Sequence, residues 1–396
     1  MKKLVFSLAL LSLVFTSCTS SDDDVAVTPP MATGDITGDV AASKTYIKGT
    51  YALSGTVRVK SGVTLTFEAG SVVTADASNG ADALLVENGG KLNIAGTAAE
   101  PVVFTEKSKT AGSWGGIIMF GDAPIVSGKS SSTGAPITTA TSEDGTNIVY
   151  GGTNPAHNGG SLKYVRVEYA GKKILDGNSE MNGFSFYSVG SGTVLENLVS
   201  YKGADDGFEF YGGTVSAKNL ISYGNTDDSF DWQDGWQGQA NTNWYAYQTG
   251  AGNFGMEIES KSVNNAFFPK VSNITLRRAA GTITEAGNPL EVDAIQFKKE
   301  GNGEYSNVVI SGYTSANATS VRIQDAATNT NQVLTGKIKM LNVKIADNTS
   351  LWGAGTTTFT VTFLPANYTT STTATGAVLT PGAWAIVDGV NLLGNL

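Results

Sequence analysis

The chain has very little cysteine and histidine, with one of each, Cys18 and His157, in 396 residues. It therefore has no disulfide within the chain, and sites built from several cysteines or histidines are excluded. We expect His157, in a Gly- and Asn-rich stretch, to be a solvated loop residue, which argues against a histidine triad. Charged residues are 15% and the net charge is −9. This balance disfavours nucleic acid and anionic lipid surfaces as partners.

Proline and helical periodicity are also scarce. The sequence has 10 prolines but 48 glycines, and no segment keeps a 3.6-residue apolar period. Low charge with many Gly, Thr, Ser and Asn residues predicts short strands joined by tight turns, and few helices.

The N-terminus predicts a lipid anchor. Met1-Lys2-Lys3 precedes an apolar run from Leu4 to Phe15, which is too short to span a bilayer and is typical of a signal peptide. Thr16-Ser17-Cys18 resembles a bacterial lipobox, so we expect a signal peptide at 1–17 and acylation of Cys18. The alternative is an ordinary secretory signal with an incidental cysteine.

A polar stretch with three consecutive aspartates follows Cys18. It resembles the start of surface-exported lipoproteins of the Bacteroidota. We expect residues 18–48 to be a flexible acidic tether. The resemblance implies a lipid-anchored protein of the outer membrane that faces the cell exterior, with a possible outer-membrane protein partner of unknown identity.

Two strand types alternate along the chain. Asp205-Asp206 and Asp227-Asp228 lie 22 residues apart, each just before an apolar-x-apolar triplet. Such an echo predicts a solenoid whose successive turns stack about 4.8 Å apart. The triplets are Phe184–Phe186, Phe208–Phe210, Phe230–Trp232, Met256–Ile258, Ile295–Phe297 and Val321–Ile323. Strands that follow an asparagine, at Asn197, Asn219, Asn273, Asn307 and Asn342, form the second series. Those asparagines predict either a ladder of side-chain amides or an Asx turn at each corner.

The first half of the chain has the same plan. Gly89 to Thr97, then Pro101 to Thr105, and Trp114 to Ile118 give strands separated by Gly-rich corners. They resemble right-handed parallel β-helices of the pectin-lyase-like class. We therefore predict an all-β protein with a parallel β-helix over residues 49–345, an excursion at 121–160 and a C-terminal cap at 346–396 that closes the open end.

The middle residues of the triplets should point outward in one column: Ser185, Glu209, Asp231, Glu257, Gln296 and Arg322. Glu209, Asp231 and Glu257 would then lie on adjacent turns. Carboxylates about 5 Å apart repel unless a cation or proton compensates, and Ca²⁺ suits flexible carboxylate ligands. A Ca²⁺ site is one hypothesis; the other is that the acids splay into water.

Four residues resemble parts of the catalytic pattern of polygalacturonases, which are β-helical glycosidases. Asp206 matches a first aspartate, Asp227-Asp228 match an aspartate pair, and Lys298 matches a basic residue. The resemblance implies acid–base hydrolysis by these carboxyls. The sequence departs from the pattern with Phe254 where histidine is expected and Gln296 where arginine is expected. The alternative is that the aspartates cap turns through Asx hydrogen bonds.

Residues 233–250 are rich in aromatic and amide side chains, including Trp236, Trp244, Tyr245 and Tyr247. Such residues bind neutral sugars by stacking and hydrogen bonding, so we predict a ligand-binding aromatic loop. The alternative is that the aromatics pack the loop onto the wall of the β-helix.

Three functions remain open. The first is a non-catalytic surface lipoprotein that binds glycan or another surface ligand, with Ca²⁺ as the cofactor if one is used. The second is a carbohydrate-active enzyme, a hydrolase or a lyase. The third is a structural or adhesive scaffold. The whole chain is similar to a group of Bacteroidota outer-membrane lipoproteins with β-helices and no established activity, which favours the first and third.

Overall fold

The computed structural model describes residues 31–396, apart from 77–81, 174–179, 262–267, 287 and 348–349. The expected signal peptide 1–17, Cys18 and the tether as far as Pro30 lie outside the described residues. No helix in the described part is long and apolar enough to span a membrane.

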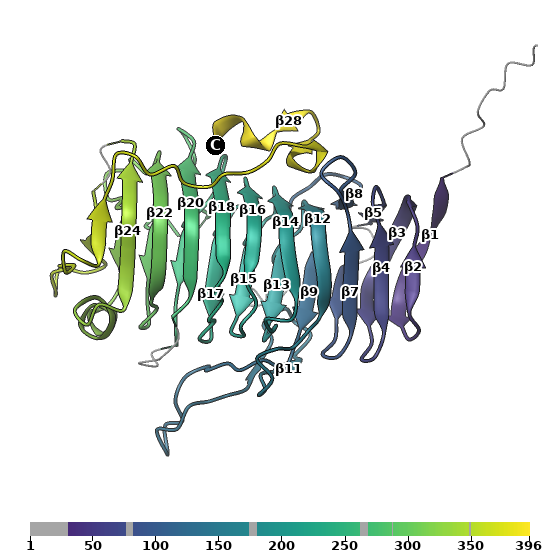
Figure 1. Cartoon of the computed structure of the whole chain (residues 1–396), viewed down its shortest axis with the longest axis horizontal. Helices are drawn as coiled ribbons and strands as arrows, with labels where there is room; N and C mark the ends of the chain where they lie inside the picture. Colours follow the sequence, from purple (N-terminus) through teal and green to yellow (C-terminus); the bar gives the residue numbers. More distant parts are fainter. Residues whose placement is uncertain (1–30, 77–81, 174–179, 262–267, 287, 348–349) are drawn as a thin grey trace, which may run out of the picture. The chain divides into compact units, whose positions relative to one another are not determined.

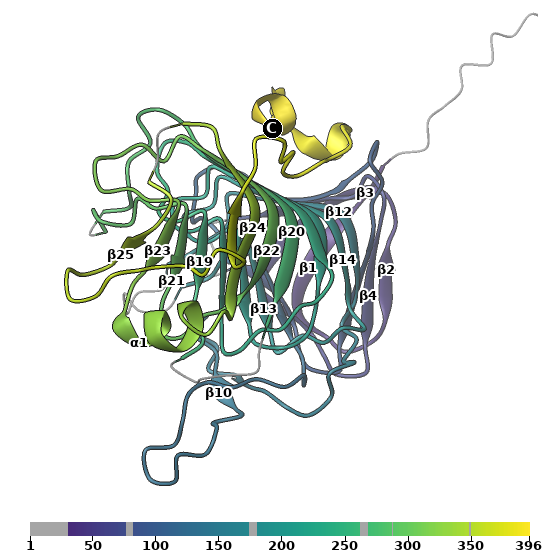
Figure 2. The ribbon, with the colours of Figure 1, turned by 60° about the vertical axis from the view of Figure 1, so that its left-hand side comes forward.

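Nearly all strands are parallel and stack in successive turns (Figures 1 and 2). In one sheet, called here the site sheet, each strand pairs with the next through its apolar-x-apolar triplet. Its strands are β6 (Ala83–Val86), β9 (Ile117–Phe120), β13 (Phe184–Tyr187), β15 (Phe208–Tyr211), β17 (Phe230–Gln233), β19 (Met256–Ile258), β21 (Ile295–Phe297), β23 (Val321–Ile323) and β25 (Gly353–Ala354). The prediction of an all-β, right-handed parallel β-helix is confirmed.

Two further sheets complete the early turns. Their strands are β1 (Ala32–Val40), β2 (Lys44–Tyr46), β3 (Gly49–Val59), β4 (Thr64–Glu68), β5 (Val72–Ala75), β7 (Lys91–Ala95) and β8 (Val102–Glu106). The second half of β3 also pairs with β6 of the site sheet. The next strand, β12 (Gly160–Glu168), pairs with β7 through its first half and with β8 through its second half. From β12 onward, single bent strands therefore carry both sheets. They are β14 (Val194–Tyr201), β16 (Ala217–Tyr223), β18 (Asn241–Gln248), β20 (Lys270–Arg278), β22 (Gly303–Ser311) and β24 (Ile338–Ile345).

Asparagines make the bend in these strands. Asn197, Asn219 and Asn243 have φ of 60°, 59° and 59°, a left-handed conformation that asparagine tolerates better than most residues. The amide of Asn219 donates to Oδ1 of Asn197 over 2.9 Å, and that of Asn243 donates to Asn219 over 3.0 Å. These asparagines thus form an amide ladder, which was one of the two predicted alternatives, and the role is structural. The ladder is interrupted at Asn273, whose amide donates to Thr242 Oγ1 over 2.9 Å.

The interior is filled by the inward members of each triplet. Phe208 stacks between Phe184 and Phe230, with ring centroids 4.9 and 5.7 Å away. Like residues stack on successive turns because the parallel register places them directly above one another.

Both ends differ from the sequence-based boundaries. Residues 32–48, assigned to the tether, form β1 and β2, and β1 pairs in parallel with β3. Among residues 32–49, only Ile36, Tyr46 and Gly49 are buried, so the apolar pattern of the later strands is weak in this part of the chain.

At the other end, β25 and β26 (Tyr368–Thr370) extend the parallel pairing. Val361, Phe363 and Tyr368 of the predicted cap join the core cluster of the β-helix. The residues after β26 instead run back along the side of the β-helix from β20 towards β12 (Figure 1). Ala377 N–H donates to Thr275 Oγ1 over 2.9 Å, and Arg166 donates to the Ala383 carbonyl over 3.0 Å. This C-terminal segment covers apolar side chains on the outer surface of these strands.

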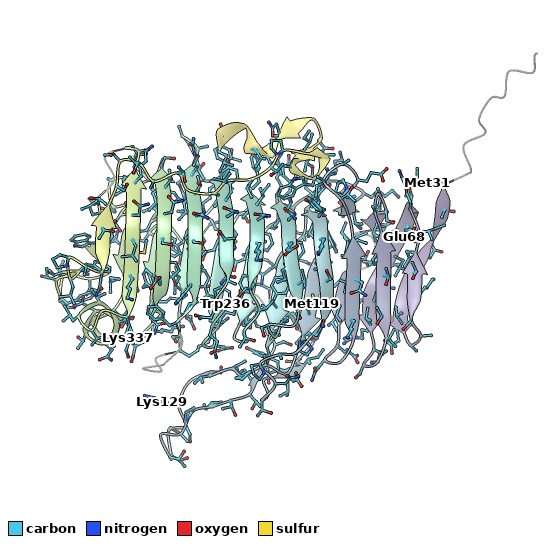
Figure 3. All side chains as sticks on the ribbon, viewed as in Figure 1. Met31, Glu68, Met119, Lys129, Trp236 and Lys337 are labelled. Atoms are coloured by element: carbon cyan, nitrogen blue, oxygen red, sulfur yellow. The ribbon has the colours of Figure 1, made fainter. Side chains whose placement is uncertain are left out.

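Residues 121–159 leave the β-helix between β9 and β12. They contain a short antiparallel pair, β10 (Ala140–Thr141) and β11 (Val149–Tyr150), and Lys129, labelled in Figure 3, lies on this excursion away from the strands. Tyr150 packs on Tyr187 of the site sheet, with ring centroids 4.9 Å apart. His157 is 5% exposed, so the expectation of a solvated histidine was wrong. A helical turn after β23 includes α1 (Ala326–Thr328; Figure 2).

Candidate functional site

The outward column predicted from the triplets is present in the site sheet. Glu209 of β15 is in register with Ser185 on one side and Asp231 of β17 on the other. Asp231 is in register with Glu257, which is followed by Gln296 and Arg322. The register prediction is therefore confirmed.

An acidic cavity of about 210 Å³ lies over this column. The described residues that line it include ten carboxyl groups: Glu143, Glu180, Asp205, Asp206, Glu209, Asp227, Asp228, Asp231, Glu257 and Glu291. Lys298 is the one positively charged side chain among the described lining residues. Such an excess of carboxyls in a confined space requires protons or cations, because like charges at short distance destabilise one another.

The aspartate pairs lie in the turns that precede β15 and β17. Asp206 Oδ1 accepts the Asp228 N–H over 2.8 Å, and Asp228 Oδ1 accepts the Phe254 N–H over 2.6 Å. These aspartates therefore have a capping role, as the structural alternative predicted, but through hydrogen bonds to the next rung and not through local Asx hydrogen bonds. They line the acidic cavity at the same time, so capping does not exclude a role in binding.

Glu209 is held by three neutral donors. Asn182 donates to its Oε2 over 2.7 Å, Tyr211 donates to the same oxygen, and Gln233 donates to Oε1 over 3.0 Å. Gln233 also donates to Glu143 of the excursion over 2.7 Å. These donors orient the carboxyl without neutralising it.

Lys298 is engaged by acidic side chains. It forms an ion pair with Glu257, and Glu259 lies 3.7 Å from its ammonium. Burial by itself would lower the pKa of Lys298, but Glu257, Asp231 and Glu259 together raise it above the usual value. Lys298 is therefore protonated at neutral pH and is unsuited to act as a base.

Burial is the main cause of the raised carboxyl pKa values in the cavity. It raises the pKa of Asp206 and Asp231 well above the ordinary value, and neighbouring carboxylates raise it further. Burial, followed by the charge of Glu285, raises the pKa of Asp227 to about 7. Burial also raises the pKa of Glu291 to about 7, and the charge of Glu257 is the second largest cause.

The carboxylates fit a hard cation. Oxygens of Asp206, Glu209 and Asp231 lie within 4.8 Å of one another. Asp231 is 9% exposed, and its Oδ1 has no hydrogen-bond partner among the described residues. A set of carboxylate oxygens is the donor chemistry of Ca²⁺ and Mg²⁺, so these acidic groups can bind a metal ion. Glu257, expected as a third ligand, belongs to none of the carboxylate groups of the described part and pairs with Lys298 instead.

The four residues of the polygalacturonase resemblance do meet. Asp206, Asp227, Asp228 and Lys298 all line the acidic cavity. Phe254, at the position of the expected histidine, is 1% exposed and does not line it.

The prediction of an aromatic ligand-binding loop is wrong for three of the four residues that it named. Trp236, Trp244 and Tyr245 are each at most 1% exposed. Trp236 and Trp244 lie in the core, and Tyr245 belongs to the cluster beneath the C-terminal segment. Residues 241–248 of the predicted loop are strand β18, in which Trp244 and Tyr245 are both buried. Tyr247 is partly buried and packs on Tyr223, with ring centroids 5.0 Å apart.

Several lining residues were missed. Glu143, Glu180 and Glu291 lie outside the repeated triplets, and no sequence signal places them at the cavity. Asn182 had a signal, because Asn182-Gly183-Phe184 corresponds to Asp206-Gly207-Phe208 one turn later.

A second cavity of about 660 Å³ adjoins the acidic one and shares Glu257, Asn288, Glu291 and Lys298 with it. It continues along the site sheet past Gln296 to Gln324. Arg322, at its far part, is held by Asp293 through contacts of 2.9 and 3.0 Å. Together the two cavities offer an acidic region and a region whose lining includes the amides of Asn288, Gln296, Asn317 and Gln324.

The sequence over residues 34–386 matches the family described as "Pectate-lyase like beta helix domain". No curated protein and no solved structure matches the chain. The family match covers most of the chain and agrees with the parallel pairing of the strands. The chain therefore belongs to the family of pectate-lyase-like β-helix domains.

Proposed function

We propose that the protein is a cell-surface lipoprotein that binds carbohydrate through Ca²⁺ held in the acidic cavity, without catalysis. The observation that carries the proposal is the acidic cavity itself. Its carboxyls outnumber its positive groups by ten to one, and Asp231 keeps a buried oxygen with no partner among the described residues.

Asp206, Glu209 and Asp231 would hold the ion. Asn182, Tyr211 and Gln233 orient Glu209, so part of the ligand set is held in place by neutral donors. When bound, Ca²⁺ supplies coordination positions that sugar hydroxyls can fill.

The family supports carbohydrate as the ligand, since it is described by its likeness to enzymes that act on pectate. The adjoining cavity supports it too, because Gln296, Gln324 and Asn288 can hydrogen-bond to hydroxyl groups. The charge of the acidic cavity favours an uncharged sugar. Even with a bound ion, its remaining carboxyls repel an anionic polymer.

The state of Lys298 supports a non-catalytic role. A lyase needs a base, and the ammonium of Lys298 is held in its protonated form by Glu257 and neighbouring acids. One observation favours a second candidate, a polysaccharide hydrolase. The pKa values of Asp227 and Glu291 are raised to about 7, where a carboxyl can act as a general acid.

A pull-down with insoluble polysaccharides tests the binding. We expect retention on uncharged polysaccharides in CaCl₂, release by a chelator, and no retention on polygalacturonate. Asp231→Asn should lose at least tenfold in affinity, whereas Asp325→Asn, outside the cavity, should bind as the native protein does. Release of reducing ends from a bound polymer would establish the hydrolase instead. Absence of binding to every polymer would leave the scaffold role.

Surface attachment through Cys18 is tested separately. Cells that express the full chain and are fed a labelled fatty acid should label the protein, and Cys18→Ser should abolish the label. Protease added to intact cells should digest the labelled protein if it faces the exterior. An unlabelled native chain would contradict lipidation and would favour an ordinary secretory signal.

A further inference from the structure

A second carboxylate group in the acidic cavity shares no residue with the first. Oxygens of Glu180, Asp205 and Asp227 lie within 4.8 Å of one another. Asp205 and Asp227 occupy the same turn position on successive rungs, and Glu180 comes from the segment before β13. Winding of the β-helix thus brings together a second set of three acidic side chains.

Asp205 has an oxygen that the protein does not satisfy. The residue is 2% exposed and lines the acidic cavity. Its Oδ1 accepts the Asp206 N–H over 3.0 Å, but its Oδ2 has no hydrogen-bond partner among the described residues. A buried carboxylate oxygen without a partner is costly, so this oxygen requires a proton or a cation.

The nearby donors serve the other members of the group. Lys173 forms an ion pair with Glu285, and its ammonium lies 3.3 Å from Glu180. Asn253 donates to Asp227 Oδ1. Lys173 is partly exposed and bound by these two glutamates, so it leaves Asp205 Oδ2 without a direct contact.

The acidic cavity also has more negative charge than one divalent ion can balance. The acidic cavity has ten carboxyls and one ammonium among its described lining residues. A single divalent ion at Asp206, Glu209 and Asp231 leaves the carboxyls of the second group unbalanced. The pKa of Asp205 is raised by burial and then by Asp227 and Glu180, which agrees with this imbalance.

We propose that Glu180, Asp205 and Asp227 form a second divalent-cation site, so that the acidic cavity binds two ions. The inference rests on the proposed function in so far as the first ion is held by Asp206, Glu209 and Asp231. The two sets share no side chain, but a third group, in which Asp228 lies with Asp206 and Asp227, joins them. Asp205 and Asp231 belong to one group each, so their replacement removes one site while the other remains. Ca²⁺ is the probe because both donor sets consist of carboxylate oxygens.

Ion stoichiometry tests the proposal. Isothermal titration of the purified protein with CaCl₂ at pH 8, together with native mass spectrometry, should give two ions per chain. Asp205→Asn should give one, since it keeps the Oδ1 acceptor for the Asp206 N–H but removes the charge. Asp231→Asn should also give one, and the double variant none.

The remaining ion in each single variant reports that the protein is still folded. Asp325→Asn, a carboxylate outside the cavity, should keep both ions. One ion in the native protein, unchanged by Asp205→Asn and lost in Asp231→Asn, would overturn the second site and leave the proposed function standing. One ion lost only in Asp205→Asn would overturn the first site. No ion in the native protein would overturn both.

Discussion

Asp206→Asn is expected to stabilise the ion-free protein at pH 8 and to weaken its stabilisation by Ca²⁺. In chelator, removal of this carboxyl should raise the free energy of unfolding, because burial and then the charges of Asp228 and Asp227 raise its pKa well above the ordinary value and so oppose its ionised form at pH 8. Asparagine keeps the oxygen that accepts the Asp228 N–H. At Ca²⁺ 100-fold above Kd, the native protein should gain about 2.7 kcal/mol per site. The variant should lose the part of this stabilisation that comes from the ion bound at Asp206.

Chemical denaturation in chelator and in CaCl₂ measures both effects. Asp293→Asn is a matched control, because Asp293 Oδ1 accepts the Thr319 N–H over 2.6 Å in an equivalent turn. Asp293 differs in being paired with Arg322. Its replacement should destabilise the protein and leave the Ca²⁺ response unchanged. A decrease in stability for Asp206→Asn in chelator would contradict the account of a repulsive cavity.

The raised carboxyl pKa values also make the stability of the protein depend on pH. The pKa of Asp227 is about 7 in the folded protein and near 3.8 when unfolded, so the folded state binds more protons between these values. The stability that this group contributes is complete below about pH 4 and is lost as the pH rises to 7. Ca²⁺ replaces those protons, so its stabilising effect should be large at pH 8 and small at pH 5.

Trp244→Ala is expected to lower the free energy of unfolding by about 3–5 kcal/mol, the usual cost of removing a large buried ring. The indole is fully buried, with its ring centroid 4.8 Å from Phe230 and 6.0 Å from Trp236. Its Nε1 donates to the Ala217 carbonyl over 3.0 Å, and the variant leaves that carbonyl without this donor. The shift of the denaturation midpoint measures the loss.

Tyr247→Ala is the control on the same strand. Tyr247 is partly buried on the outer surface and contacts Tyr223, so its removal should cost about 1 kcal/mol. Without denaturant, and at a temperature at which both variants are folded, both should bind Ca²⁺ as the native protein does. A Trp244→Ala variant with native stability but without carbohydrate binding would restore the idea of an aromatic binding surface.

The column over the site sheet shows what a strand pattern can predict. Triplets such as Phe208–Phe210 and Phe230–Trp232 alternate inward and outward positions, and parallel stacking then aligns Glu209 with Asp231 whatever the length of the turns. The aromatic residues show its limit. Trp244 and Tyr245 are adjacent in β18 and are both buried, one in the core and one beneath the C-terminal segment. A local pattern cannot reveal that a distant segment covers the outer face of a strand.

The sequence by itself determined the repeat, the all-β class, the parallel β-helix and the acidic column, because each depends on local alternation and on a repeat that recurs along the chain. The tertiary structure decided the cavity. Glu143 from the excursion and Glu180 and Glu291 from irregular segments meet the column only through the path of the folded chain. It also decided that Glu257 pairs with Lys298 while Asp206 joins Glu209 and Asp231. Ion pairing depends on distances between side chains of different turns, and no spacing in the sequence contains them.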